Sequence, residues 1–152
     1  SRPTLSTGVN PMILTLEIAQ NLIGLALKEG RKLKLMPLTA AVLDAGGHTI
    51  AMAREDGASN LRPQVAHGKA YGSLALGIGS RAIFNRAEQQ PFFIQSINAL
   101  ADGALVPSPG GVLIKSDGVI IGAIGVTGDT GDNDEKCAVS AINSAGFKAE
   151  TG

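Results

Sequence analysis

The stretch that decides the fold is residues 109–128, which read Pro-Gly-Gly-Val-Leu-Ile-Lys-Ser-Asp-Gly-Val-Ile-Ile-Gly-Ala-Ile-Gly-Val-Thr-Gly. Two apolar runs, 112–115 and 119–126, flank a Ser-Asp-Gly turn, and this pattern is typical of a β-hairpin. Glycines at positions 122, 125 and 128 leave backbone uncovered, so a ligand, a partner chain or a packed helix can approach closely there. The stretch therefore predicts an antiparallel pair of strands with accessible backbone.

A second hairpin is predicted nearer the N-terminus, with strands over 38–43 and 49–54 joined by the turn 44–48. Residues 106–111 contain two prolines, so they form an edge strand or a loop and not a central strand. The spacing of apolar residues predicts helices over 15–29, 64–76, 81–88, 92–102 and 134–145. Hairpins separated by helices favour an α+β fold, with one antiparallel sheet of about five strands covered by helices.

The chain of 152 residues fits one domain, expected over residues 15–152 after an extended arm over 1–14. Its net charge is zero and the two signs are interspersed, which argues against nucleic acid and membranes as partners. No apolar run is long enough to cross a bilayer, so we expect a cytoplasmic protein. Cys137 is the single cysteine and falls on the apolar face of the last helix, so we expect it to be buried.

Six short motifs resemble, in order and spacing, those of the GlcG/HbpS family, the haem-degrading family that includes the C-terminal domain of PduO-type proteins. The motifs are Val42-Leu-Asp-Ala-Gly-Gly-His48, Arg54-Glu-Asp-Gly-Ala58, Ala66-His-Gly-Lys-Ala70, Gly110-Gly-Val112, Ile121-Gly-Ala-Ile-Gly-Val126 and Asp132-Asn-Asp-Glu135. The resemblance covers residues 15–146. It implies a profilin-like sandwich, in which a five-stranded antiparallel sheet carries helices on both sides. It also implies a homo-oligomer based on dimers, which in this family often assemble to octamers.

Haem is a candidate ligand because the resemblance includes members that bind haem or a corrinoid, and others that bind iron. In the PduO-type domains that bind haem, the resemblance implies that a histidine on the first helix ligates the haem. Residues 15–29 of this chain contain no histidine. His48 is interpreted as a solvated turn residue, whereas His67 stays a candidate axial ligand. The Glu-x-x-Glu pair of the iron-binding relatives is also missing from the sequence. We therefore expect no required cofactor and no metal, with haem as the open alternative.

Four carboxylates near the start of the last helix have two interpretations. Asp129, Asp132, Asp134 and Glu135 could attract a hard cation. They could also stabilise the helix start, with Asp132 as N-cap and Glu135 three residues later completing a capping box. We prefer the capping interpretation.

A set of basic residues predicts an anion site. Arg54 ends a strand, Arg62 begins a helix, and Lys69 lies seven residues further along the same side of that helix. Arginine presents paired donors to a carboxylate, and lysine adds a point charge. We predict that Arg81, Asp129 and the backbone of Gly110 and Gly111 also line this anion site. The alternative is a set of surface charges that pair with Glu55, Asp56 and Asp44.

The sequence therefore leaves three hypotheses for function. In the first, a homo-oligomer binds a small anionic organic ligand, an organic acid in preference to haem, between the second long helix and the glycine-rich hairpin. In the second, a cofactor-free enzyme converts a reactive organic acid of the muconate type by tautomerisation, hydrolysis or deamination. Lys69, His67 or Tyr71 would then act as acid or base, with the arginines orienting the substrate. In the third, the oligomer is structural or regulatory and binds no small ligand.

Overall fold

The computed structural model describes residues 13–152, so most of the predicted arm over 1–14 lies outside the described residues. The elements, in chain order, are α1 (Leu16–Lys32), β1 (Thr39–Asp44), β2 (Thr49–Arg54), α2 (Arg62–Leu76), α3 (Ser80–Gln89), α4 (Pro91–Leu100), β3 (Gly111–Ser116), β4 (Val119–Thr127), α5 (Gly131–Ser144) and β5 (Lys148–Glu150). None of the helices between residues 13 and 152 is long and apolar enough to cross a lipid bilayer.

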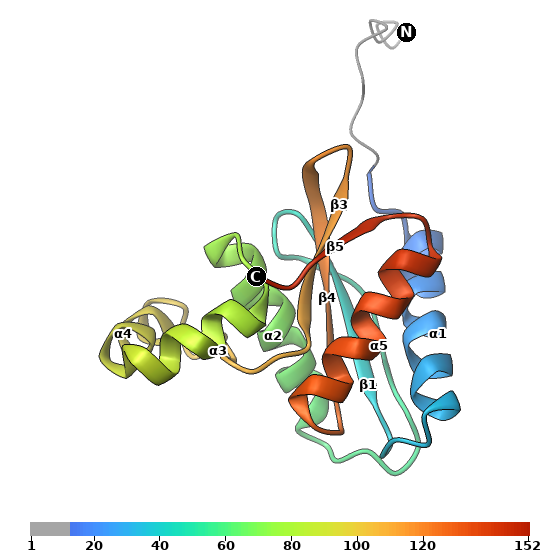
Figure 1. Cartoon of the computed structure of the whole chain (residues 1–152), viewed down its shortest axis with the longest axis horizontal. Coiled ribbons are helices and arrows are strands. Elements are labelled where there is room, and N and C mark those ends of the chain that lie inside the picture. Colours follow the sequence, from blue (N-terminus) through green and yellow to red (C-terminus); the bar gives the residue numbers. More distant parts are fainter. Residues whose placement is uncertain (1–12) are drawn as a thin grey trace, which may run out of the picture.

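The five strands form one antiparallel sheet in the order β2-β1-β4-β3-β5. Helices α1 and α5 cover one face of this sheet and α2 covers the other (Figure 1). Alternate residues of each strand therefore point into two separate cores. The predicted α+β fold, with a five-stranded antiparallel sheet between helices, is confirmed.

Two local features differ from the prediction or were missing from it. Residues 106–110 form a loop, which is one of the two predicted alternatives, and the fifth strand is instead β5, which was not predicted and pairs with β3. Helix α5 begins at Gly131, and Thr130 caps it by accepting a hydrogen bond from the backbone N–H of Asn133 at 3.2 Å. The predicted capping box on Asp132 and Glu135 is therefore wrong, because the helix already starts before Asp132.

The glycines of the hairpin allow α2 to lie close to the sheet. A Cβ on Gly125 would overlap the carbonyl oxygen of Ala66, and a Cβ on its strand partner Gly111 would overlap the carbonyl oxygen of Lys69. Of the three neighbours that the sequence allowed at position 125, the packed helix is the one observed. This contact fixes the height of α2 above β3 and β4.

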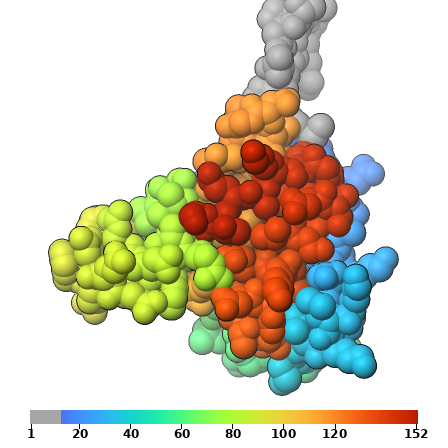
Figure 2. Space-filling model, viewed as in Figure 1, coloured from blue at the N-terminus to red at the C-terminus, as the bar shows by residue number. Residues whose placement is uncertain are grey.

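Helices α3 and α4 project from the body of the molecule as a lobe on the α2 side (Figures 1 and 2). The lobe has a small core of its own, built on Ile83, Ile94 and Leu105. The two larger cores lie against the faces of the sheet. The lobe therefore depends little on the sheet for its packing.

Candidate functional site

Lys69 is buried and its charge is compensated inside the protein. Its side chain is 3% exposed, and Nζ donates to the carbonyl oxygen of Val126 at 2.9 Å and to Oδ2 of Asp134 at 3.1 Å. Burial lowers the pKa of Lys69 and raises the pKa of Asp134, and in each case the charge of the partner opposes the shift. The structure therefore places Lys69 in an ion pair that joins α2 to α5, away from solvent.

Arg54 and Arg62 lie at the same end of the sheet, on the α2 face. Thr39 of β1 pairs with Arg54 on one side and with Thr127 on the other, so these three residues share a face. Arg62 joins them from α2, because its Nη1 donates to Oγ1 of Thr127 at 2.7 Å. We call Arg54, Thr39, Thr127 and Arg62 the arginine–threonine row.

The charges of the row are not neutralised within residues 13–152. The neighbouring Glu55 forms its ion pair with Arg31, and no carboxylate of the described residues lies within ion-pair distance of Arg54 or Arg62. Helix α2 starts beside the row without a capping side chain and without an acidic residue in its first turn, so its N-terminal dipole adds positive potential. The alternative in which these arginines pair with surface acids is not what the structure shows.

Thr39 carries the most unusual polar atom in the described part of the chain. Its side chain is fully buried, and Oγ1 has no hydrogen-bond partner there. Leaving a buried hydroxyl unpaired costs about 1–3 kcal/mol. A buried, unpaired hydroxyl between two arginines is a group that a bound molecule would satisfy.

A hollow adjoins the row and is lined by one of the predicted acid–base residues, His67. It measures about 400 Å³ and is lined by Met52, Pro63, Gln64, His67, Asp102, Gly103 and Ala104; we call it the His67 hollow. Met52 lies two residues before Arg54 on the same face of β2, and Pro63 follows Arg62. The His67 ring stacks on Tyr71, with centroids 5.5 Å apart and planes inclined by 17°. His67 therefore lies beside the arginine–threonine row, whereas Tyr71 contacts His67 and lies close to Gly47, in the turn between β1 and β2.

The other predicted site residues lie elsewhere. Arg81 donates to both carboxylate oxygens of Glu135 at 2.9 and 3.0 Å and also pairs with Asp132, which ties α3 to α5. Asp129 accepts hydrogen bonds from Asn133 Nδ2 and from the backbone N–H groups of residues 36 and 130, which lower its pKa. Gly110 lies beside Lys69 Nζ and the backbone of β4, and Gly111 packs on α2.

These contacts divide the predicted acidic cluster among separate partners. Asp134 forms an ion pair with Lys69, whereas Asp132 and Glu135 form ion pairs with Arg81. Asp129 accepts hydrogen bonds in the loop before α5. Within the described range, no three acidic, histidine or cysteine side chains are arranged to hold a metal ion.

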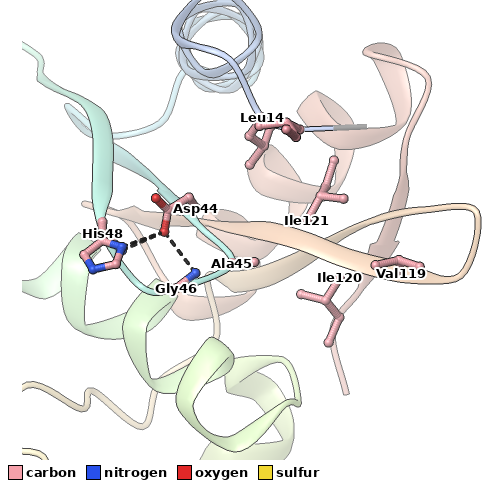
Figure 3. Close-up of a pocket in the computed structure, with 9 residues that line it drawn as sticks. Leu14, Asp44, Ala45, Gly46, His48, Val119, Ile120 and Ile121 are labelled. Carbon is pink, nitrogen blue, oxygen red and sulfur yellow. Dashed lines mark hydrogen bonds and ion pairs between the residues drawn. The ribbon is translucent and has the colours of Figure 1, made fainter. Parts of the chain in front are cut away.

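A second hollow lies near the opposite end of β1 (Figure 3). Its volume is about 320 Å³, and its lining is mostly apolar: Ile13, Leu14, Asp44, Ala45, Gly46, His48, Val119, Ile120 and Ile121. Oδ1 of Asp44 accepts from the backbone N–H groups of Gly46 and His48 and lies 3.2 Å from His48 Nδ1, and these contacts hold the pKa of Asp44 below its usual range. This hollow carries a carboxylate and no arginine, so it does not suit an anion.

Sequence reasoning did not identify Thr39, Thr127, Met52 or Asp134 as partners in these sites. One signal for the threonines was present, because each is a polar residue that ends a run of apolar strand residues, 40–43 in β1 and 119–126 in β4. The pairing of Lys69 with Asp134 gives no such signal, because the two residues are 65 positions apart.

The family follows from comparison with known proteins. The family model described as haem degrading protein HbpS-like matches residues 14–143. The chain belongs to the HbpS-like family. A protein of Citrobacter freundii, described as an uncharacterized 15.0 kDa protein in the dhaT-dhaS intergenic region, is 30% identical to this HbpS-like chain over 108 residues, which are 71% of the chain and 75% of the relative.

Two solved structures have the same fold as this HbpS-like protein. A PduOC:haem complex superposes with a TM-score of 0.80 at 22% identity, covering 90% of this chain and 97% of that one. A double mutant of HbpS from Streptomyces reticuli superposes with a TM-score of 0.77 at 25% identity, covering 96% and 98% of the two chains. The predicted GlcG/HbpS-like membership is confirmed.

Proposed function

We propose that this HbpS-like protein binds a small organic anion, a mono- or dicarboxylate, at the arginine–threonine row. The observation that carries the proposal is the buried, unpaired hydroxyl of Thr39, which lies between two arginines that have no acidic partner in the described part of the chain. A carboxylate would accept hydrogen bonds from the guanidinium groups, and its oxygen would also pair the hydroxyl. The N-terminus of α2 would favour the same charge.

The organic part of the ligand would occupy the His67 hollow. This hollow adjoins the row through Met52 and Pro63, and its volume of about 400 Å³ falls within the range of small-molecule sites. Lys69 takes no direct part in this proposal, because its charge is buried against Asp134. Lys69 instead helps to position Thr127, because its Nζ donates a hydrogen bond to the carbonyl oxygen of the preceding residue, Val126.

Thermal unfolding with and without unsaturated dicarboxylates tests the proposal. A ligand at a hundred times its Kd raises the free energy of unfolding by about 2.7 kcal/mol, so the melting temperature should rise with ligand concentration. Arg62→Gln and Thr39→Val should lose this response. Arg86→Gln should keep it, because Arg86 lies over the Phe93 ring in the lobe. If no carboxylate shifts the melting temperature, or if Arg62→Gln responds as the parent does, the row is not the binding site.

The same samples distinguish binding from conversion. The enzymatic hypothesis requires a titratable group beside the bound anion, and His67 lines the hollow with its ring against Tyr71. Loss of the ultraviolet absorbance of an unsaturated acid would report turnover. Turnover that disappears in His67→Ala, while the thermal shift persists, would establish a cofactor-free enzyme with His67 as its acid or base.

Haem is the second candidate ligand, and one observation favours it. Met52 and His67, two residue types that serve as axial haem ligands, line the same hollow, and two arginines adjoin it. The residues present therefore fit a haem in ligand type and in charge, although α1 contains no histidine. Titration with haemin should give a saturable Soret shift that His67→Ala abolishes and His48→Ala does not. A shift that survives in His67→Ala would exclude this hollow.

A further inference from the structure

The His67 hollow has a negative side as well as a positive one. Asp102 is the one carboxylate among the residues that line it, and this exposed side chain forms no ion pair within residues 13–152. Asp102 follows the C-terminal end of α4, where a helix carries partial negative charge, and no basic residue lies in the last turn to offset that charge. The loop after α4 therefore presents a negative potential to the hollow.

The positive and negative sides of the hollow lie on opposite sides of α2. The carbonyl of Ala66 packs against the sheet, where a Cβ on Gly125 would overlap it. Gly68, two residues later and therefore about 200° around the helix, packs instead against residues 104–106 of the loop. The arginine–threonine row thus lies at the level of the sheet, whereas Asp102 lies at the level of this loop.

The hollow connects these two levels along one side of α2. It is lined there by Pro63, Gln64 and His67, and Met52 of β2 lies at its end next to the row. Because an α-helix with its side chains is about 10–12 Å wide, a molecule that reaches both levels holds its two charged ends well apart. An α-amino acid carries both charges on one carbon, about 2.5 Å from each other, so it does not suit this arrangement.

We propose that the ligand of this site is an ω-amino carboxylate, which carries its amino group at the far end of the chain from its carboxylate. The carboxylate binds the arginine–threonine row and the ammonium group binds Asp102. The inference rests on the proposed function, because the row has to bind the carboxylate, and it assigns the other end of the ligand. An amino group at the end of an alkyl chain has a pKa near that of lysine, about 10.4, so both ends are charged at pH 7.

Calorimetric titration of the full chain at pH 7 with matched acids tests the proposal. The acids are 5-aminopentanoate, its isomer 2-aminopentanoate, pentanoate and hexanedioate. The parent should bind 5-aminopentanoate about two- to fivefold more tightly than pentanoate, which is the gain expected from one exposed ion pair. The isomer should show no such gain, because its ammonium group lies next to the carboxylate and therefore meets the arginines. Hexanedioate should bind more weakly than 5-aminopentanoate, because its second carboxylate meets the charge of Asp102.

Two matched variants assign the effect to Asp102. Asp102→Asn should bind pentanoate as the parent does and lose the preference for 5-aminopentanoate; asparagine tolerates the left-handed backbone at this position, where φ is 53°. Asp117→Asn is the control and should keep the preference, because Asp117 is an exposed aspartate with a φ of 50° in the turn between β3 and β4.

The possible failures of the inference and of the proposed function are distinct. Equal affinity of the parent for 5-aminopentanoate and pentanoate, or for the two isomers, would overturn the inference and leave the anion site in place. A preference that persists in Asp102→Asn would do the same. If none of the four acids binds to the parent, the anion site itself is wrong, and the inference fails with it.

Discussion

The buried pair of Lys69 and Asp134 gives the sharpest prediction for stability. Lys69→Met removes the cation and leaves the carboxyl of Asp134, which is 2% exposed, with the backbone N–H of Asp129 as its remaining donor at 2.9 Å. Methionine keeps most of the volume and the apolar stem of lysine, so the change acts mainly on charge. We expect the variant to fold with a large loss of stability.

The magnitude follows from the protonation of Asp134. A buried carboxyl that has lost its cation becomes neutral by taking up a proton. At pH 7 this costs about 4 kcal/mol for a group with an ordinary pKa near 3.9. Removing one partner of a buried ion pair typically costs about 3–5 kcal/mol, which agrees. We therefore expect a loss of about 4 kcal/mol at pH 7, a large share of the 5–15 kcal/mol that stabilises a typical domain.

Urea unfolding at several pH values measures this loss and its cause. In Lys69→Met, the pKa of Asp134 in the folded state lies above its unfolded value, so the folded protein binds more protons than the unfolded chain. Lowering the pH therefore favours the folded variant, and its deficit relative to the parent should shrink by about 1.4 kcal/mol per pH unit between pH 7 and pH 5. A simple packing defect would show no such dependence.

The double variant Lys69→Met/Asp134→Asn is the matched control. It removes both charges, and the asparagine oxygen can still accept the hydrogen bond from Asp129. It should recover most of the lost stability, because replacing a whole buried ion pair is often close to neutral. If Lys69→Met loses less than about 1 kcal/mol, or if the double variant is no better than the single one, the charge of Asp134 is not what Lys69 compensates.

Two further predictions concern packing. Gly125→Ala should lose about 3 kcal/mol or more in urea unfolding, because the new methyl group meets the backbone carbonyl of Ala66; Gly24→Ala, on the open side of α1, should instead gain about 0.5–1 kcal/mol. Burial raises the pKa of Cys137 to about 11, so its thiol should not react with Ellman's reagent in the native protein at pH 8 and should react fully in urea; fast reaction in the native state would contradict its burial.

Local sequence patterns were enough to predict most of the fold. The strand over 49–54 matches β2 at both ends, because turn residues bound it on each side. Strand β5 was missed, since three residues after Gly146 carry too few alternations to be recognised. Helix α1 runs past the predicted end at 29, because Gly30 packs against Leu38 inside the helix and does not end it. These errors occur where tertiary contacts outweigh local preference.

The candidate site was only partly predictable. The spacing of Arg62 and Lys69 correctly indicated one side of a helix, but spacing does not show how deeply each side chain is buried. Lys69 reaches a carboxylate on α5, whereas Arg62, the first residue of α2, reaches Thr127. Thr39 lies beside Thr127 only because of the register in which β1 pairs with β4. This register could not be read from the sequence.

The separate core of the lobe has a consequence for hydrogen exchange. Opening α3 and α4 would expose the cluster around Ile83, Ile94 and Leu105, whereas opening β4 would disrupt the packing on both faces of the sheet. Amide protons of the lobe should therefore exchange through a local fluctuation of low free energy, while those of β4 should exchange only when the whole molecule unfolds. Solvent should reach this protein in two stages, the lobe first and the central strand last.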